Sequence, residues 1–183
     1  MDKFQNKYRI PSARLQNWNY GSPGFYFITV CTRNREHYFG EIFNDQMILN
    51  ELGTIVQSEW IKSPEIRPDM NLELGEFVVM PNHFHGIMII GENEFNCVDD
   101  CRDAMHRVFT TPTNKFGPQS KNLGSIMRGF KSSVTTHSKI LKIEFAWQER
   151  YHDHIIRSHD EFERISNYIL NNPNNWTDDK FFN

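Results

Sequence analysis

The order of apolar and polar positions along this chain predicts a mixture of strands and helices. Four aromatic, β-branched or apolar runs predict strands over 25–32, 72–79, 83–90 and 151–157. Apolar residues at helical spacing predict helices over 47–61, over 123–141 and from 158 to near 172. Pro64 and Pro173 end the first and the last of these helices, because proline cannot continue the helical hydrogen-bond pattern.

The predicted order of elements is β-α-β-β-α-β, followed by a C-terminal helix. This order is typical of a ferredoxin-like α+β sandwich, in which helices cover one face of an antiparallel sheet. The turn at Pro81-Asn82 joins two of the strands into an expected antiparallel hairpin. Ser158 and Glu161 have the spacing of a capping box, which opens the last helix.

The bulk properties of the chain predict one globular domain, residues 1–183. The 183 residues are 38% hydrophobic, and 15 of them are phenylalanine, which is enough to build a core. Residues 1–23 are polar and predict an irregular arm, and residues 91–121 predict a long loop of the kind that is usually functional or mobile. The sequence contains neither an apolar run long enough to span a membrane nor a signal peptide, and its three cysteines make no disulfide framework. We therefore expect a cytoplasmic protein with no membrane segment.

The net charge of −3 argues mildly against a nucleic-acid partner, but the basic residues are unevenly distributed. Residues 1–35 carry six Lys and Arg against one acid, and residues 121–142 carry five Lys and Arg and no acid. Two basic segments on a mildly acidic protein are compatible with binding a polyanion. Ordinary solvent-exposed charge is the alternative interpretation.

The motif His83-Phe84-His85 is the first candidate for chemistry. Side chains alternate faces along a strand, so His83 and His85 point to one side and Phe84 to the other. Phe84 can then anchor the strand in a core while both histidines present ring nitrogens to one cation. A pair of histidines is weak support by itself, since such residues are often ordinary surface or core residues.

The predicted C-terminal helix supplies a third ligand and a reactive group. Tyr168 and Asn172 are four residues apart, so they lie on one helical face about one turn from each other. They fall beside the apolar stripe of Phe162, Ile165 and Ile169 rather than within it. A tyrosine at this border can reach an adjacent cleft with its hydroxyl.

These motifs resemble the single-tyrosine transposases of the HUH class, most closely the branch associated with repetitive extragenic palindromes (REP). The resemblance rests on His83-Phe84-His85, on the segment YILNNP at 168–173 and on DHIIR at 153–157. It extends from about Gly24 to Trp176 and includes the order of strands and helices. The long segment 91–121 and the acidic net charge depart from an idealised member, which affects substrate recognition more than chemistry.

The resemblance implies a metal-dependent transposase that cuts and rejoins single-stranded DNA near hairpins. His83, His85 and Asn172 would hold a divalent cation, Mg²⁺ or Mn²⁺. Tyr168 would be the nucleophile and would form a 5′-phosphotyrosine intermediate, because a phenol activated at the metal can attack the scissile phosphate. The partners would be single-stranded or hairpin DNA and, by analogy, a second copy of the chain, with the tyrosine helix able to complete the partner's site.

Other polar residues are candidates for weaker roles. Phosphate contacts are predicted, with plain solvated charge or a structural role as the alternative, for Arg33, Arg35, Arg128, Lys131, His154 and Arg157. A zinc site at Cys97, Cys101 and His106 lacks a fourth ligand at standard spacing, so a plain loop is favoured. His152 and His154 share a strand face, which leaves a second metal pair as a minor alternative.

Two other functions compete with the transposase. One is a domesticated module that holds structured DNA without cutting it, although binding alone requires none of His83, His85, Tyr168 and Asn172. The other is a histidine–metal phosphodiesterase in which water attacks, which would leave Tyr168 dispensable.

Overall fold

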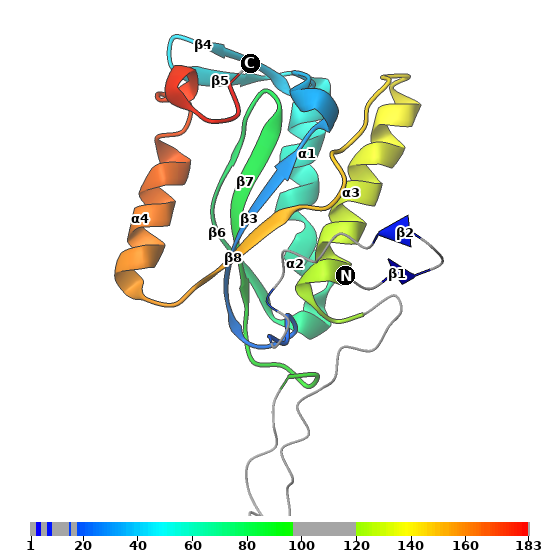
Figure 1. Ribbon diagram of the computed structural model, residues 1–183, viewed down its shortest axis with the longest axis vertical. Helices are drawn as coiled ribbons and strands as arrows, with labels where there is room; N and C mark the ends of the chain where they lie inside the picture. The colour runs from blue at the N-terminus through cyan, green and yellow to red at the C-terminus, as the bar shows by residue number, and fades with distance from the viewer. Residues whose placement is uncertain (1–2, 5–6, 9–14, 16–17, 97–119, 183) are drawn as a thin grey trace, which may run out of the picture.

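A four-stranded antiparallel sheet forms the centre of the protein (Figure 1). The structure is a computed structural model and describes residues 3–4, 7–8, 15, 18–96 and 120–182. The strands lie in the order β6, β7, β3, β8, with bounds Leu72–Val79, His83–Ile90, Gly24–Cys31 and His152–Ile156. Because β7 lies between β3 and β6 and runs antiparallel to both, the sheet has ferredoxin-like topology. The predicted α+β fold class is confirmed.

The three long helices divide between the two faces of this sheet. Figure 1 shows α1 (Glu51–Ile61) and α3 (Leu123–Ile140) on one side of the sheet and α4 (His159–Leu170) on the other. The α4 helix packs mainly on β6 and touches β7. The expected layer of helices on one face is therefore joined by a second layer, made by the C-terminal helix alone.

The main hydrophobic core lies between the sheet and the pair α1 and α3. Phe84 contacts Trp60 of α1 and Phe130 of α3, with ring centroids 4.7 and 5.4 Å away. Gly86 makes this packing possible, because a Cβ there would lie 2.8 Å from atoms of Trp60 and Phe84. A smaller core on the other face joins the buried side chains Ile87, Ile156, Ile165 and Ile169.

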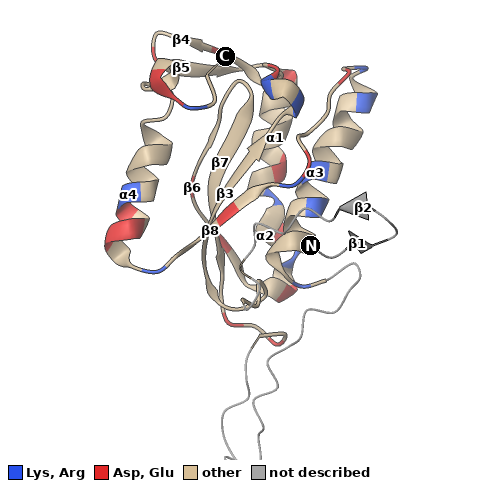
Figure 2. Cartoon of the chain, viewed as in Figure 1, with Lys and Arg blue, Asp and Glu red and all other residues tan. Residues whose placement is uncertain are grey.

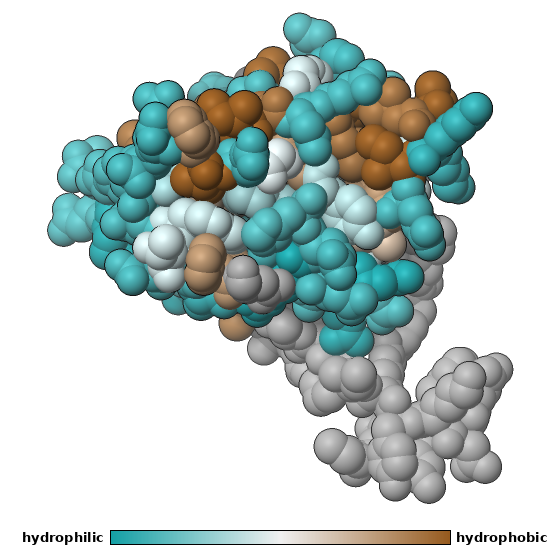
Figure 3. Space-filling model, turned by 90° about the horizontal axis from the view of Figure 1, so that it is seen from above, coloured by the Kyte–Doolittle hydropathy of each residue, from teal (hydrophilic) through white to brown (hydrophobic). Residues whose placement is uncertain are grey.

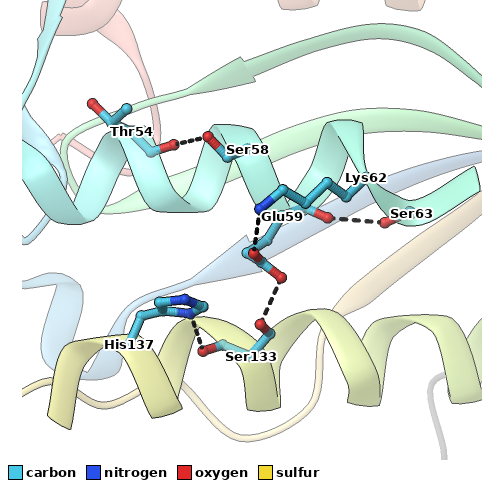
Figure 4. Close-up of polar contacts among 7 residues, drawn as sticks. All are labelled: Thr54, Ser58, Glu59, Lys62, Ser63, Ser133 and His137. Atoms are coloured by element: carbon cyan, nitrogen blue, oxygen red, sulfur yellow. Dashed lines mark hydrogen bonds and ion pairs between the residues drawn. The ribbon is translucent and has the colours of Figure 1, made fainter. Parts of the chain in front are cut away.

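One polar group is buried between α1 and α3 (Figure 4). The Glu59 carboxylate accepts a hydrogen bond from Ser133 Oγ at 2.5 Å and pairs with Lys62 Nζ at 3.3 Å. Ser63 Oγ donates to the main-chain carbonyl of Glu59 at 3.2 Å. This hydrogen bond from Ser133 ties α1 to α3, which are also joined by the edge-on ring contact of Trp60 with Phe130.

The predicted helix over 47–61 is wrong at its start. Residues Gly40–Phe43 (β4) and Gln46–Leu49 (β5) form an antiparallel hairpin, and α1 begins only at Glu51. Asn44 and Asp45 have φ values of 49° and 59°, as in the type I′ turns that connect two-residue hairpins. Asn50 then caps α1, because its side-chain oxygen accepts a hydrogen bond from the Gly53 amide at 2.9 Å.

Shorter elements complete the described part of the chain. They are β1 (Lys3–Phe4), β2 (Lys7–Tyr8), α2 (Ser63–Ile66) and the 3₁₀ turns η1 (Arg33–Arg35), η2 (Pro68–Met70) and η3 (Trp176–Asp178). The predicted irregular arm 1–23 thus contains one antiparallel ladder, β1 with β2. Most of the predicted loop 91–121, with Cys97, Cys101 and His106, lies outside the described residues. Among the described residues, no helix combines the length and apolar character that crossing a membrane requires.

Charged and apolar residues are unevenly spread over the surface. Figure 2 shows Lys and Arg along α3 and at η1, and acidic residues in the first turns of α4. Figure 3 looks onto the end that carries β4, β5 and the C-terminus, where apolar patches alternate with polar side chains. Phe43, Ile48 and Phe182 are among the exposed apolar residues of these segments. Patches broken up in this way are ordinary for a protein surface.

Candidate active site

The histidine pair lies on the face of β7 that α4 covers. His83 and His85 are 0% and 1% exposed, and their ring centroids are 4.5 Å apart. Phe84 points to the opposite face, into the main core, as strand alternation predicts. In the neighbouring strand β3, Cys31 is paired with His83 and Thr29 with His85. The sheet therefore fixes both imidazoles side by side.

Hydrogen bonds from neighbouring residues orient both rings. Asn82 donates its side-chain NH₂ to the carbonyls of Arg35 and Phe181, at 3.1 and 2.8 Å. Its side-chain oxygen lies 2.9 Å from Nδ1 of His83 and can only accept there, so Nδ1 carries the hydrogen. Nδ1 of His85 lies 2.9 Å from the Thr29 hydroxyl. This arrangement leaves Nε2 of His83 unprotonated with an available lone pair, the form of the imidazole that binds a metal ion.

The helix α4 brings Tyr168 to these histidines within the same chain. The Tyr168 hydroxyl lies 3.2 Å from Nε2 of His85. The Tyr168 ring also contacts Phe27 edge-on at 6.3 Å between centroids, while the side chain stays 39% exposed. Ile165 and Ile169 are buried beneath it, so the predicted position at the border of the apolar stripe is confirmed.

The start of α4 is held to the sheet by Glu161. Ser158 caps the helix, since its hydroxyl accepts a hydrogen bond from the Glu161 amide at 3.2 Å. The Glu161 carboxylate accepts from the Arg157 amide at 2.9 Å and from Nε2 of His154 at 2.8 Å. The predicted reciprocal capping box is thus only half formed, because the glutamate binds the preceding strand rather than the cap residue.

Asp179 is a site residue that the sequence did not single out. Its Oδ2 lies 3.3 Å from the Tyr168 hydroxyl and accepts a hydrogen bond from Nδ2 of Asn172 at 2.9 Å. Ligand atoms of Asp179, His83 and His85 all lie within 4.8 Å of one another. No motif marked this residue, because an acid in a polar C-terminal tail is common.

Two buried atoms at the site have no hydrogen-bond partner. They are Nε2 of His83 and Oδ1 of Asn172, whose side chain is 2% exposed. A buried polar atom without a partner costs free energy, so such atoms mark places where a ligand is expected. An imidazole nitrogen and an amide oxygen beside a carboxylate form a donor set that suits Mn²⁺, and less readily Mg²⁺. The predicted ligands His83, His85 and Asn172 therefore fit a divalent cation.

Burial and charge shift the pKa values of the site in ways that matter for chemistry. Burial lowers the pKa of His83 to about 3 and that of His85 well below its usual value, so both rings are neutral at neutral pH. Burial and the Asp179 carboxylate raise the pKa of Tyr168 to about 12. In the metal-free protein the tyrosine hydroxyl is consequently protonated at neutral pH.

The C-terminal segment covers the histidines. The Phe181 ring lies 4.5 Å from the His83 ring and 5.7 Å from the His85 ring, between centroids. Trp176 of η3 lies 5.9 Å from His83. This aromatic cover, together with the sheet, accounts for the near-complete burial of the pair.

The predicted phosphate contacts fall into two groups. Arg33 and Arg35 belong to η1, beside the C-terminal segment, where Arg35 donates to the Lys180 carbonyl. Arg128 lies on the exposed side of α3. Lys131 donates to the carbonyls of Gln148 and Arg150, both at 2.8 Å. Lys131 thereby holds a loop.

The two remaining candidates lie in β8 and directly after it, and both are bonded to the first turn of α4. His154 is bonded to Glu161, and the Arg157 amide is bonded to the same carboxylate. His152, the partner of His154 in the alternative metal pair, belongs to no cluster of three potential ligands among the described residues. A DNA contact for these residues stays a prediction.

Comparison with known proteins identifies a close relative. No protein-family model matches the chain. An uncharacterized protein of Haemophilus influenzae is 41% identical over 172 residues, which cover 93% of this chain and 92% of that protein. The chain belongs to the family of this Haemophilus protein. The relationship extends over nearly the whole length of both proteins.

A solved structure shares the fold. It is a REP-associated tyrosine transposase bound to a REP hairpin, and it aligns with 91% of this chain and 74% of its own length, with a TM-score of 0.57 and 21% identity. At this identity the likeness establishes the fold. The ferredoxin-like sheet with its C-terminal helix, predicted from the order of strands and helices, is thus a fold that this chain shares with the solved transposase.

Proposed function

We propose that this protein is a metal-dependent transposase that cleaves and rejoins single-stranded DNA through a 5′-phosphotyrosine intermediate. The observation that carries the proposal is the position of the Tyr168 hydroxyl, 3.2 Å from the nearer of two buried, neutral histidines. A phenol placed at a metal-binding pair of imidazoles is the arrangement that nucleophilic attack on a phosphodiester requires. The shared fold with a REP-associated tyrosine transposase supports the same class.

The cation would be held by His83, His85 and Asn172, with Asp179 as a further oxygen ligand. The unpartnered His83 Nε2 and Asn172 Oδ1 are the atoms that fit this role. Mn²⁺ or Mg²⁺ bound there would neutralise charge on the scissile phosphate and on the oxygens that develop charge during transfer. The Asn172 amide is held by Asp179 through its nitrogen, which leaves its oxygen available for the ion.

The covalent step exchanges one phosphate ester for another. The Tyr168 oxygen forms a bond to phosphorus, the bond from phosphorus to the 3′ oxygen of the preceding nucleotide breaks, and that oxygen takes a proton from solvent. The phenolic proton goes to the Asp179 carboxylate, whose Oδ2 lies 3.3 Å from the Tyr168 hydroxyl. Since one ester replaces another, a free 3′-OH can reverse the step and rejoin the strand without ATP.

The proposed substrate is single-stranded DNA with a nearby hairpin. The related structure was solved with a REP hairpin, which makes this class of DNA the first to test. A homodimer is proposed by analogy alone. Tyr168 meets His85 of its own chain, so the chemistry as proposed needs no helix from a partner.

The test is a denaturing gel of protein incubated with labelled hairpin oligonucleotide and Mn²⁺ or Mg²⁺. Label is expected to become covalently attached to the wild-type protein, and EDTA or Tyr168→Phe is expected to abolish this product. Tyr38→Phe is a matched control, because Tyr38 packs on Phe145 away from the histidines and loses the same hydroxyl. It should retain the adduct.

Two results would support the competing functions. Cleavage that persists in Tyr168→Phe without an adduct would identify a histidine–metal phosphodiesterase that uses water. Hairpin binding without cleavage, under conditions in which a REP-associated transposase is active, would identify a DNA-binding module.

A further inference from the structure

An open cleft lies beside the histidine pair, on the same face of the sheet but over β3 and β8 rather than beneath α4. It has a volume of about 480 Å³, and its walls include Thr29, Arg35, Arg150, Tyr151, Lys180 and Phe181. Two of these residues also belong to the site: Thr29 bonds His85, and Phe181 packs on His83. The cleft therefore adjoins the place where the scissile phosphate would bind.

A second hollow of about 690 Å³ continues this cleft outward along η1. It is lined by Arg33 and Asn34 and shares Arg35, Gln148 and Arg150 with the first. Lys131 fixes the wall formed by residues 148–150, because it donates to both the Gln148 and the Arg150 carbonyls. The two hollows together make one groove with a preformed wall.

The chemistry of the groove suits a nucleotide. Arginine and lysine side chains outnumber acids in its lining, where Glu149 is the one carboxylate among the described residues, so a phosphate is favoured. The half-buried Tyr151 supplies an aromatic ring to the cleft, and the Arg35 guanidinium lies 4.8 Å from the centre of the buried Phe181 ring. Cationic side chains next to aromatic rings are the usual components of sites for single-stranded nucleic acid.

The geometry of phosphoryl transfer indicates which side of the cut would lie in the groove. In an in-line displacement the nucleophile and the leaving oxygen lie on opposite sides of phosphorus. Tyr168 comes from α4, which lies over β6 and β7, and its hydroxyl contacts Nε2 of His85. The cleft lies over β3 and β8, where Thr29 contacts Nδ1 of the same ring. A leaving 3′ oxygen on the side of phosphorus opposite Tyr168 would face the cleft.

We propose that this groove binds the nucleotide on the 5′ side of the cut, whose 3′-OH is the leaving group. The inference rests on the proposed function, because it takes Tyr168 as the nucleophile. Arg35, Arg150 and Lys180 contact the backbone phosphates of that strand, and Gln148 contacts its base. A released 3′-OH that stays in the groove remains aligned with the phosphotyrosine for rejoining.

The experiment uses a synthetic DNA hairpin flanked on both sides by randomised single strand, with Mn²⁺. Protein-linked products and released strands are sequenced separately, so that preferences on the two sides of the cut are read independently. With the wild-type protein, a base preference is expected at the last nucleotide of the released strand. No adduct at all would contradict the proposed function, whereas an adduct without such a preference would contradict only this inference.

Variants in the groove assign the preference to its residues. Gln148→Ala should remove the preference on the 5′ side and keep those on the 3′ side. Arg150→Gly removes the guanidinium without backbone cost, since Arg150 has a φ of 66° that glycine adopts freely. It should raise KM for the selected DNA about tenfold and leave kcat within about twofold, because one charged hydrogen bond is lost on binding.

A second measurement keeps the inference falsifiable if cleavage is slow. An oligonucleotide that ends in the selected 3′-OH is titrated into the Tyr168→Phe protein by fluorescence anisotropy. Arg150→Gly should weaken its binding about tenfold and leave binding of the downstream strand unchanged. Arg164→Ala is the matched control, because Arg164 is an exposed arginine on the outer side of α4. Equal losses for both strands, or in both arginine variants, would overturn the inference.

Discussion

The two faces of the central sheet are built by the same strands, but one face carries the main core and the other carries the candidate site. On one face, β3 and β7 contribute Tyr26, Ile28 and Phe84 to a large apolar core beneath α1 and α3. On the other face, the alternate residues Thr29, His83 and His85 meet α4 and the C-terminal segment. Each histidine is thus one residue away from a core position.

This difference shows how a small domain can bury the polar side chains of a site without losing stability. The core face supplies burial of apolar area, so the free energy of folding does not depend on the site face being apolar. The site face keeps its buried imidazoles neutral and holds them by hydrogen bonds with Asn82 and Thr29. Four changes would break or sharpen this comparison.

Phe84→Ala should produce the largest effect and should act on the core face. Loss of a buried ring that packs on Trp60 and Phe130 is expected to lower the free energy of unfolding by about 3–5 kcal/mol. Urea denaturation measures this change. Phe84→Leu, which keeps most of the volume, should lose much less. A small loss in Phe84→Ala would mean that the core face is not the main source of stability.

Acid should destabilise the site face. The pKa of each buried histidine is lowered in the folded protein, to about 3 for His83, while the unfolded chain titrates near 6.5. Between these values the unfolded state binds more protons, so stability is full above the unfolded pKa and falls as the pH drops. The expected slope is about 1.4 kcal/mol per pH unit for each histidine.

Urea unfolding of the metal-free protein at several pH values measures this slope. His83→Gln should reduce it by about one histidine's share. An unchanged slope in His83→Gln would show that the pair is not held neutral.

Asn82→Ala should weaken metal binding while sparing the ligands themselves. The side chain orients His83 and ties the carbonyls of Arg35 and Phe181, so its loss is expected to lower Mn²⁺ affinity by about 10–100-fold. Calorimetric titration with Mn²⁺ measures the affinity. Asn82→Asp keeps an acceptor for His83 but loses both donors. Equal affinities for Asn82→Ala and the wild type would show that His83 is oriented without Asn82.

Ser133→Ala should have the smallest effect. The hydroxyl donates to the Glu59 carboxylate between α1 and α3, and its loss should cost about 1–2 kcal/mol of stability. Thermal unfolding measures the change. Since this contact is on the core face, covalent adduct formation at Tyr168 should be unaffected. A loss of adduct at unchanged stability would show that the two faces are coupled.

The sequence predicted the sheet well and the segment after the first strand poorly. The four main strands carry strong β signals, so their order and the hairpin at Pro81-Asn82 were predictable. The β4–β5 hairpin was not, because Met47 and Ile48 also fit the spacing of the helix that follows. Its turn uses Asn44-Asp45 in the left-handed region rather than the more recognisable Asn-Gly.

The part of the site that depends on the spacing of residues within one strand or helix was predictable. The motif around His83 and His85 and the helical pair Tyr168 and Asn172 follow from strand and helix periods. Asp179 was not predictable, since it reaches Tyr168 only because the chain turns back after α4 through η3. Asn82 was predicted only as a turn residue, although it directly precedes His83 and its side chain sets the orientation of that ring.

Glu161 fixes the first turn of α4 to the neighbouring strand, whereas Tyr168 lies near the other end of the same helix. A change of helix angle at Glu161 would therefore move Tyr168. Seven residues separate the two side chains, which is about 10 Å along a helix. A tilt of only about 6° about Glu161 would therefore displace the tyrosine hydroxyl by about 1 Å, enough to spoil an attack that depends on alignment. The hydrogen bonds that Glu161 accepts from His154 and the Arg157 amide therefore help to set the position of the Tyr168 hydroxyl.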